Sequence, residues 1–170
     1  MPMITQEQIS QMHNGLFHTD FSLVRLAMPS IAHIMDTCPV QEGTVDVKVH
    51  MLMPGQYPCI PGRHCDFVPR DADGGLRRDL VTPDQTMYLW VSGPPLTLFE
   101  YDFGDTNEEA IPPQRWVPFN QNDYHRGVAS EEHCWRLFIR VVPHLLCRPS
   151  PGICIRRHTQ VYLNAEEFKW

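Results

Sequence analysis

The amino-acid sequence predicts a mainly β protein in which helices near the N-terminus cover one outer face of a sheet. Two observations lead to this prediction. From residue 44 onward, short apolar or alternating stretches separated by proline and glycine recur about every ten residues, as in β-sandwiches and barrels. Helix signals, by contrast, are confined to residues 1–40.

The N-terminal segment begins with a helix-capping signal. Thr5 and Gln8 have the spacing of a capping box, in which each side chain bonds the backbone N–H of the other residue. Three apolar residues follow at helical spacing, namely Ile9, Met12 and Leu16. A second helical stretch is expected over residues 30–35, directly after Pro29. Residues 1–40 are therefore expected to form a helical cover.

Strand signals occupy most of the remaining chain. In residues 44–53, Val45 and Val47 alternate with Asp46 and Lys48, which predicts a half-buried strand. Residues 134–142 form the strongest predicted strand, and one of its faces is wholly apolar, so burial on both sides is expected. The other expected strands are residues 86–92, 96–103, 115–119 and 153–163.

Two loops separate these strands. Residues 68–82 are polar and contain Gly74-Gly75, which is compatible with a mobile lid beside a site or with a plain surface loop. Residues 102–113 form an acidic loop.

Length and composition narrow the class of protein. A chain of 170 residues is expected to form one domain, residues 1–170, with its β core at 44–163. The net charge is −6 and no run of Lys or Arg exceeds two residues, so the sequence does not favour duplex nucleic acid as a partner. A small molecule or a protein side chain is the expected substrate class, and a homodimer is compatible with the sequence.

Cysteine usage and the N-terminus suggest a compartment. The six cysteines include no Cys-x-x-Cys, the first eight residues lack the apolar core of a signal peptide, and no apolar run reaches the length of a membrane span. The expectation is a reduced, cytoplasmic protein without membrane association.

A His-x-Asp pair, His64 and Asp66, lies in a loop rich in proline and glycine directly after the first predicted strand. Residues two apart on an extended chain point to the same side. With His125 as a third ligand, the pair would form a 2-His-1-carboxylate triad, which holds non-haem Fe(II) with positions left open. His18-Thr19-Asp20 shares the spacing but not the setting, so it serves as an internal comparison.

A plain structural explanation also exists. In that case His64 is a loop histidine, Asp66 caps a turn, and His125 pairs with Asp123.

The order His64-x-Asp66, then His125, then Arg136 with ten residues between the last two, resembles the Fe(II)/2-oxoglutarate-dependent dioxygenases. The resemblance implies a double-stranded β-helix, or jelly roll, with N-terminal helices packed on one sheet. It further implies that His64, Asp66 and His125 hold Fe(II). Arg136 would bind the distal carboxylate of the co-substrate 2-oxoglutarate, and an unidentified substrate would be hydroxylated.

Several further residues are candidates for the site. Arg140 shares the face of Arg136 and is an alternative anchor for the co-substrate. A hydroxyl from a neighbouring strand often assists the anchor, and the candidates are Tyr88, Thr97 and Tyr101. The mouth of the site is expected to draw on Arg77, Arg78, Trp90, Trp116 and Arg126.

Two other functions remain open at the level of sequence. Cupins share the barrel, but their first motif is His-x-His followed by Glu, and their second places Pro-x-Gly shortly before the metal histidine. Here Asp66 stands in place of the second histidine, and no glycine lies between Pro118 and His125. The remaining alternative is a non-catalytic jelly-roll module.

Overall fold

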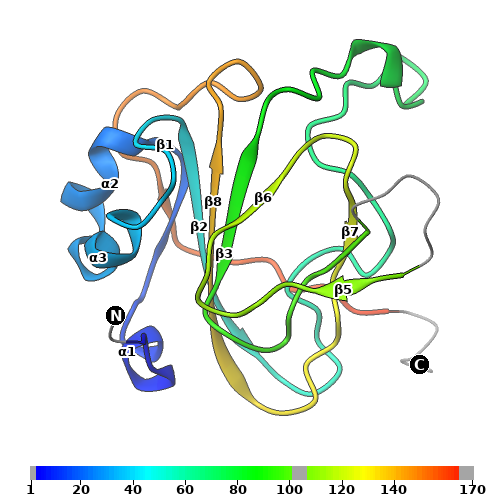
Figure 1. Cartoon of the computed structure of the whole chain (residues 1–170). Helices are drawn as coiled ribbons and strands as arrows, with labels where there is room; N and C mark the ends of the chain where they lie inside the picture. The colour runs from blue at the N-terminus through cyan, green and yellow to red at the C-terminus, as the bar shows by residue number, and fades with distance from the viewer. Residues whose placement is uncertain (1–2, 101–106, 165–170) are drawn as a thin grey trace.

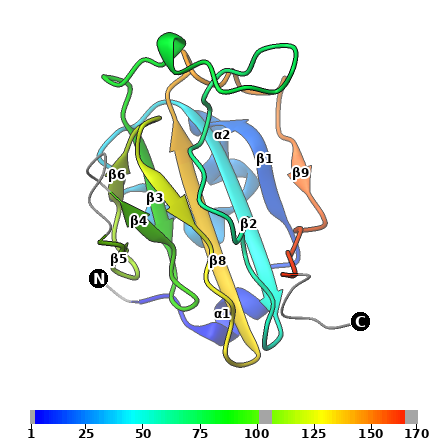
Figure 2. The same ribbon diagram turned by 90° about the vertical axis from the view of Figure 1, so that its right-hand side faces the viewer.

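The computed structural model describes residues 3–100 and 107–164, and these form a mainly β structure with two antiparallel sheets (Figure 1). The larger sheet has the strand order β6 (Val117–Phe119), β3 (Met87–Val91), β8 (Cys134–Val142), β2 (Thr44–Leu52), β1 (Gly15–Asp20) and β9 (Ile155–Arg156). The smaller sheet has the order β5 (Glu109–Ala110), β4 (Leu98–Glu100) and β7 (Tyr124–Arg126). Figure 2 shows β4 and β5 in front of the larger sheet.

Short helices cover the face of the larger sheet that points away from the smaller one (Figure 1). They are α1 (Gln6–Ser10), α2 (Phe21–Ala27), the 3₁₀ turn Pro29–Ile31 and α3 (Ala32–Met35). The predicted capping box at Thr5 and Gln8 is present at the start of α1. Buried side chains of this layer, such as Val24 and Met35, share one hydrophobic core with Val47 and Ile139 of the sheet. The predicted helical layer on one sheet is thus observed.

The N-terminal cover is not wholly helical, and this part of the prediction was wrong. Helix α1 ends at Ser10, and Leu16 lies on strand β1, where it pairs with Val47 of β2. A Cβ atom at Gly15 would stand only 2.0 Å from the carbonyl oxygen of Val47. Glycine is therefore needed where β1 joins the sheet, because any side chain at this position would collide with the β2 backbone.

Strands β2 and β8 form the centre of the larger sheet and are buried on both faces. Their apolar faces pack under the helices. Their other faces carry three cross-strand pairs, Asp46–Arg140, Lys48–Phe138 and His50–Arg136. Asp46, His50 and Arg136 are each 1% exposed. The expectation of a half-buried β2 was therefore wrong, because its polar face is covered by the rest of the molecule rather than by solvent.

The strand bounds agree with the sequence to different degrees. Strand β8 has the predicted bounds, and β3 and β6 lie inside their predicted segments. Of the segment predicted at 153–163, only Ile155–Arg156 pairs as a strand, with an isolated bridge between Tyr57 and Tyr162 further on. The predicted strand over 96–103 is seen as Leu98–Glu100, and its last residues lie outside the described ranges.

The two predicted loops contain some regular structure. The loop at 68–82 includes a 3₁₀ turn, Arg78–Leu80, and a bridge between Arg70 and Leu76. The acidic loop contains β5 in its described part. None of the helices in residues 3–100 and 107–164 has the length and apolar character of a membrane span.

Candidate metal centre

His64, Asp66 and His125 come together between the loop after β2 and strand β7. His64 and His125 exchange two backbone hydrogen bonds, with N···O distances of 2.9 and 2.8 Å, and so form an isolated antiparallel bridge. One potential ligand atom from each of the three side chains lies within 4.8 Å of the others. The structure therefore places the three predicted ligands around a common point.

Hydrogen bonds to the far side of both imidazole rings leave one nitrogen of each ring for a metal. Nδ1 of His64 lies 2.7 Å from the carbonyl oxygen of Gly62, and Nδ1 of His125 lies 3.3 Å from that of Asp123. A carbonyl oxygen only accepts hydrogen bonds, so each Nδ1 carries the proton in these contacts. In the neutral ring the lone pair is then on Nε2, the arrangement usual for metal-binding histidines.

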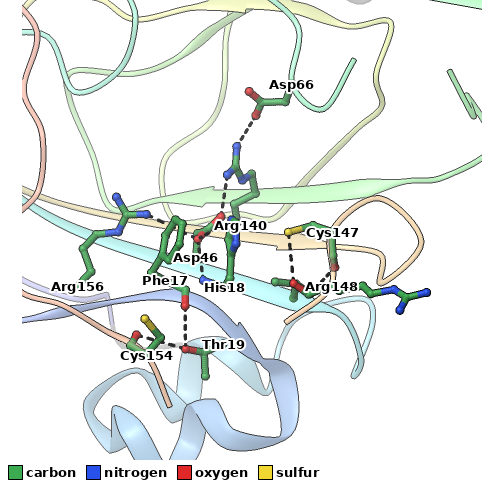
Figure 3. Close-up of polar contacts among 11 residues, drawn as sticks. Phe17, His18, Thr19, Asp46, Asp66, Arg140, Cys147, Arg148, Cys154 and Arg156 are labelled. Carbon is green, nitrogen blue, oxygen red and sulfur yellow. Dashed lines mark hydrogen bonds and ion pairs between the residues drawn. The ribbon is translucent and has the colours of Figure 1, made fainter. Parts of the chain in front are cut away.

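Asp66 is held by an arginine that also binds a second buried carboxylate (Figure 3). Arg140 donates to Oδ2 of Asp66 at 2.6 Å and to Oδ2 of Asp46 at 2.7 Å. The other oxygen of Asp66, Oδ1, lies 3.6 Å from Nε2 of His125. Two ligands of one octahedral metal ion are about 3 Å apart, so the Asp66–His125 pair is already close to the spacing that one metal ion needs.

The charges at the site favour the protonation states that a metal requires. Burial alone would raise the pKa of Asp66, but the Arg140 guanidinium and the nearby histidines hold this pKa well below its usual range. Burial and the neighbouring His125 lower the pKa of His64. An ionised carboxylate and neutral imidazoles are the forms that bind metal ions. The donor set of this site thus fits the non-haem Fe(II) that the sequence suggests.

A cavity of about 200 Å³ opens beside the three residues. Phe99 stacks on His125 with a centroid separation of 4.8 Å, and Phe119 meets the same ring edge-on. The rest of the lining combines apolar and polar side chains: Lys48, Cys59, Ile60, Leu89, Thr97, Phe138, Arg140 and Tyr162.

Arg136, the expected anchor of a co-substrate, is fully buried next to this cavity but is not part of its lining. Its Nε donates to the Pro95 carbonyl at 2.8 Å, and its Nη2 donates to the Thr97 hydroxyl at 3.2 Å. Within residues 3–100 and 107–164 it forms no ion pair with an acidic side chain. Burial lowers the pKa of Arg136 to about 10. Arg140, the alternative anchor, is already neutralised by two carboxylates.

Three aromatic candidates lie away from the cavity, which corrects the sequence-based expectation. Leu89 pairs with Arg140 and faces the cavity, so Tyr88 and Trp90, one position on either side, face the helices. The Trp116 indole donates to Ile34 and Thr37 of the helical layer. Of the hydroxyl candidates, Thr97 lines the cavity and Tyr101 lies outside the described residues.

The arginines expected at the mouth do not line the cavity. Arg77 pairs with Asp79, and Arg126 pairs with Glu108. Arg78 contacts the hydroxyl of Tyr124.

The second His-x-Asp motif has a structural role. The Asp20 carboxylate accepts a hydrogen bond from the Ser22 backbone at 2.9 Å and caps α2. Among the described residues, His64, Asp66 and His125 are the group with metal-ligand spacing, and the second motif is not part of it.

Comparisons with protein-family models, with curated proteins and with solved structures give no match for this chain.

Proposed function

We propose that this protein is an Fe(II)- and 2-oxoglutarate-dependent oxygenase that hydroxylates a small molecule or a protein side chain. The observation that carries the proposal is the convergence of His64, Asp66 and His125 beside a small cavity. We further propose that the two antiparallel sheets are the halves of a double-stranded β-helix, with the site between them. The shared hydrophobic core of Phe99 on the smaller sheet and Met87 on the larger sheet supports this arrangement.

The side chains of this site have distinct roles in the proposal. Nε2 of His64, Nε2 of His125 and one oxygen of Asp66 would hold Fe(II) and leave positions for a 2-oxo acid and for O₂. When bound there, Fe(II) would activate O₂, which is the oxidant of the hydroxylation and oxidises the 2-oxo acid as well as the substrate. Arg140 fixes the Asp66 carboxylate through its second oxygen. Phe99, which stacks on the His125 ring, and Phe119, which meets it edge-on, hold this ring in place.

The part of the cavity near Thr97 is suited to binding the co-substrate. A 2-oxo acid that chelates the metal would extend its distal carboxylate toward Thr97, whose hydroxyl is hydrogen-bonded to Arg136. The cavity volume of about 200 Å³ lies below the range of pockets that hold drug-sized ligands, so it favours a small acid such as 2-oxoglutarate.

Metal loading of the Asp66→Ala variant tests the metal site. This variant loses one charged ligand of three, so its Fe(II) or Mn(II) affinity should fall at least 100-fold, roughly the upper range known for changes around a metal ligand. Elemental analysis after anaerobic loading and desalting measures the bound metal. Asp20→Ala, in the second His-x-Asp motif, is the matched control and should load like the wild type. Equal metal content in the wild type and Asp66→Ala would refute the metal site.

Co-substrate binding tests the enzyme class. The anaerobic Fe(II) protein should bind 2-oxoglutarate with a visible charge-transfer absorption that Asp66→Ala lacks. A wild type that binds metal but no 2-oxoglutarate at millimolar concentration would point to a cupin-type metal protein. A wild type that binds neither would point to a non-catalytic jelly-roll module.

A further inference from the structure

Lys48 lies on the inner face of β2 and lines the cavity together with all three proposed metal ligands. It is directly opposite Phe138 of β8, and its Nζ lies 5.0 Å from the centroid of that ring. The guanidinium carbons of Arg136 and Arg140 lie 5.8 and 5.9 Å from the same centroid. Three cations therefore surround one aromatic side chain at this end of the cavity.

The carboxylates nearby balance only one of these three charges directly. Asp46 and Asp66 both bind Arg140. Neither Lys48 nor Arg136 has an acidic partner within 4 Å in the part of the chain that the structure describes. Burial raises the pKa of the Cys59 thiol, another lining residue, so this thiol is uncharged at neutral pH and does not neutralise the cations.

A partly buried lysine in this position is costly for the protein unless an anion joins it. Burial lowers the pKa of Lys48 to about 8, and the nearby Arg140 and Arg156 cations act in the same direction. An ammonium group with this pKa is still mainly charged at pH 7. Lys48 is partly buried and lines the cavity, whereas Arg136 is fully buried and reaches the cavity only through the Thr97 hydroxyl.

We propose that Lys48 is the direct cationic contact for the distal carboxylate of the 2-oxo acid, and that Arg136 acts by orienting Thr97. This inference rests on the proposed function and assigns the anchor to a different residue from the one that the sequence resemblance implies. The Arg136 guanidinium donates to the Thr97 oxygen, which leaves the hydroxyl hydrogen of Thr97 to donate to a carboxylate. Lys48 and Thr97 then bind one carboxylate between them.

The test compares two ligands that differ only at the distal end. 2-Oxoglutarate and 2-oxovalerate share the metal-chelating 2-oxo acid, but 2-oxovalerate lacks the second carboxylate. Calorimetry on the Mn(II)-loaded protein should show that the wild type prefers 2-oxoglutarate. Lys48→Met should weaken 2-oxoglutarate binding by roughly 30-fold or more and leave 2-oxovalerate binding unchanged. Thr97→Val should weaken 2-oxoglutarate binding by roughly 3- to 10-fold. Lys48→Arg, which keeps a positive charge, should retain most of the preference for 2-oxoglutarate over 2-oxovalerate.

The affinities for 2-oxoglutarate and 2-oxovalerate are compared within the same variant. Partial unfolding of Lys48→Met would lower both affinities equally, so it would not change their ratio. Lys48→Gln, which keeps a polar tip, should lose the preference in the same way and serves as the second variant. Retention of the wild-type preference in both variants would overturn the role of Lys48 and leave the proposed function intact. A wild type that loads Mn(II) but binds neither 2-oxo acid would overturn the proposed function itself.

Discussion

Arg140 links Asp66, a proposed metal ligand, to Asp46 in the centre of the sheet. Arg140→Met would remove the partner of two carboxylates at once. Because breaking a buried ion pair costs about 3–5 kcal/mol, the free energy of unfolding should fall by about that amount. Metal affinity should also fall by roughly 10- to 100-fold, since Asp66 would lose the contact that orients it.

Urea unfolding and metal titration of the same variant measure the two effects. Arg156→Met is the matched control, because Arg156 reaches Asp46 only at 3.8 Å. It should cost roughly 1 kcal/mol or less and leave metal affinity unchanged. Wild-type metal affinity in Arg140→Met would show that Asp66 is oriented without this arginine.

At the scale of residues, the sequence indicated the three proposed metal ligands better than it indicated the residues around them. The spacing of His64 and Asp66 depends only on local backbone geometry, so it is visible in the sequence. Lys48 was missed because alternation assigns it to the polar face of a strand without showing what covers that face. Tyr88 and Trp90 were misplaced because the inward face of β3 depends on its register with β8, which a single sequence does not contain.

At the scale of elements, Asp20 connects β1 to α2. It is the last residue of the strand and the N-cap of the helix, and its carboxylate accepts hydrogen bonds from the backbone and the side chain of Ser22. Hydrogen bonds from Ser22 lower the pKa of Asp20, so the cap is ionised at neutral pH. Asp20→Ala should lower the free energy of unfolding by about 1 kcal/mol. Asp20→Asn should keep most of the stability that the cap contributes.

Chemical denaturation at pH 7 compares these two variants with the wild type. Asn can accept the same hydrogen bonds, so equal losses in both variants would mean that the cap contributes little and the charge matters more. The contact between Oδ2 of Asp20 and Nε2 of His144, at 3.4 Å, is the one that such a result would indicate.

The sequence predicted those helices and strands that are recognisable from their own residues. It did not predict those that form only by pairing or packing with segments far away in the chain. Strand β8 was predicted with its bounds because its nine residues form an unbroken run of bulky residues. Strand β1 was missed because Gly15, which permits its close approach to β2, has no strand preference of its own. Helix α2 is only seven residues long, too short for a helical period to stand out in the sequence.

At the scale of the whole molecule, the polar interior of the larger sheet should make stability depend on pH. His50 is 1% exposed, and burial together with the Arg136 and Lys48 cations lowers the pKa of its imidazole to about 2. In the unfolded chain this pKa returns to about 6.5. Below pH 6.5 the unfolded chain therefore binds a proton that the folded protein does not bind, and stability falls as the pH decreases toward 2.

The contribution of His50 can be isolated by comparing the wild type with His50→Gln, which keeps a polar side chain but does not titrate. One proton taken up only on unfolding gives a slope of about 1.4 kcal/mol per pH unit. The free energy of unfolding of the wild type should therefore fall more steeply than that of the variant by this amount between about pH 6 and 4.5. His64, whose pKa is also lowered, affects both proteins equally and cancels in the difference. Parallel curves would mean that His50 takes up its proton in the folded state, and hence that the interior beside Arg136 admits water.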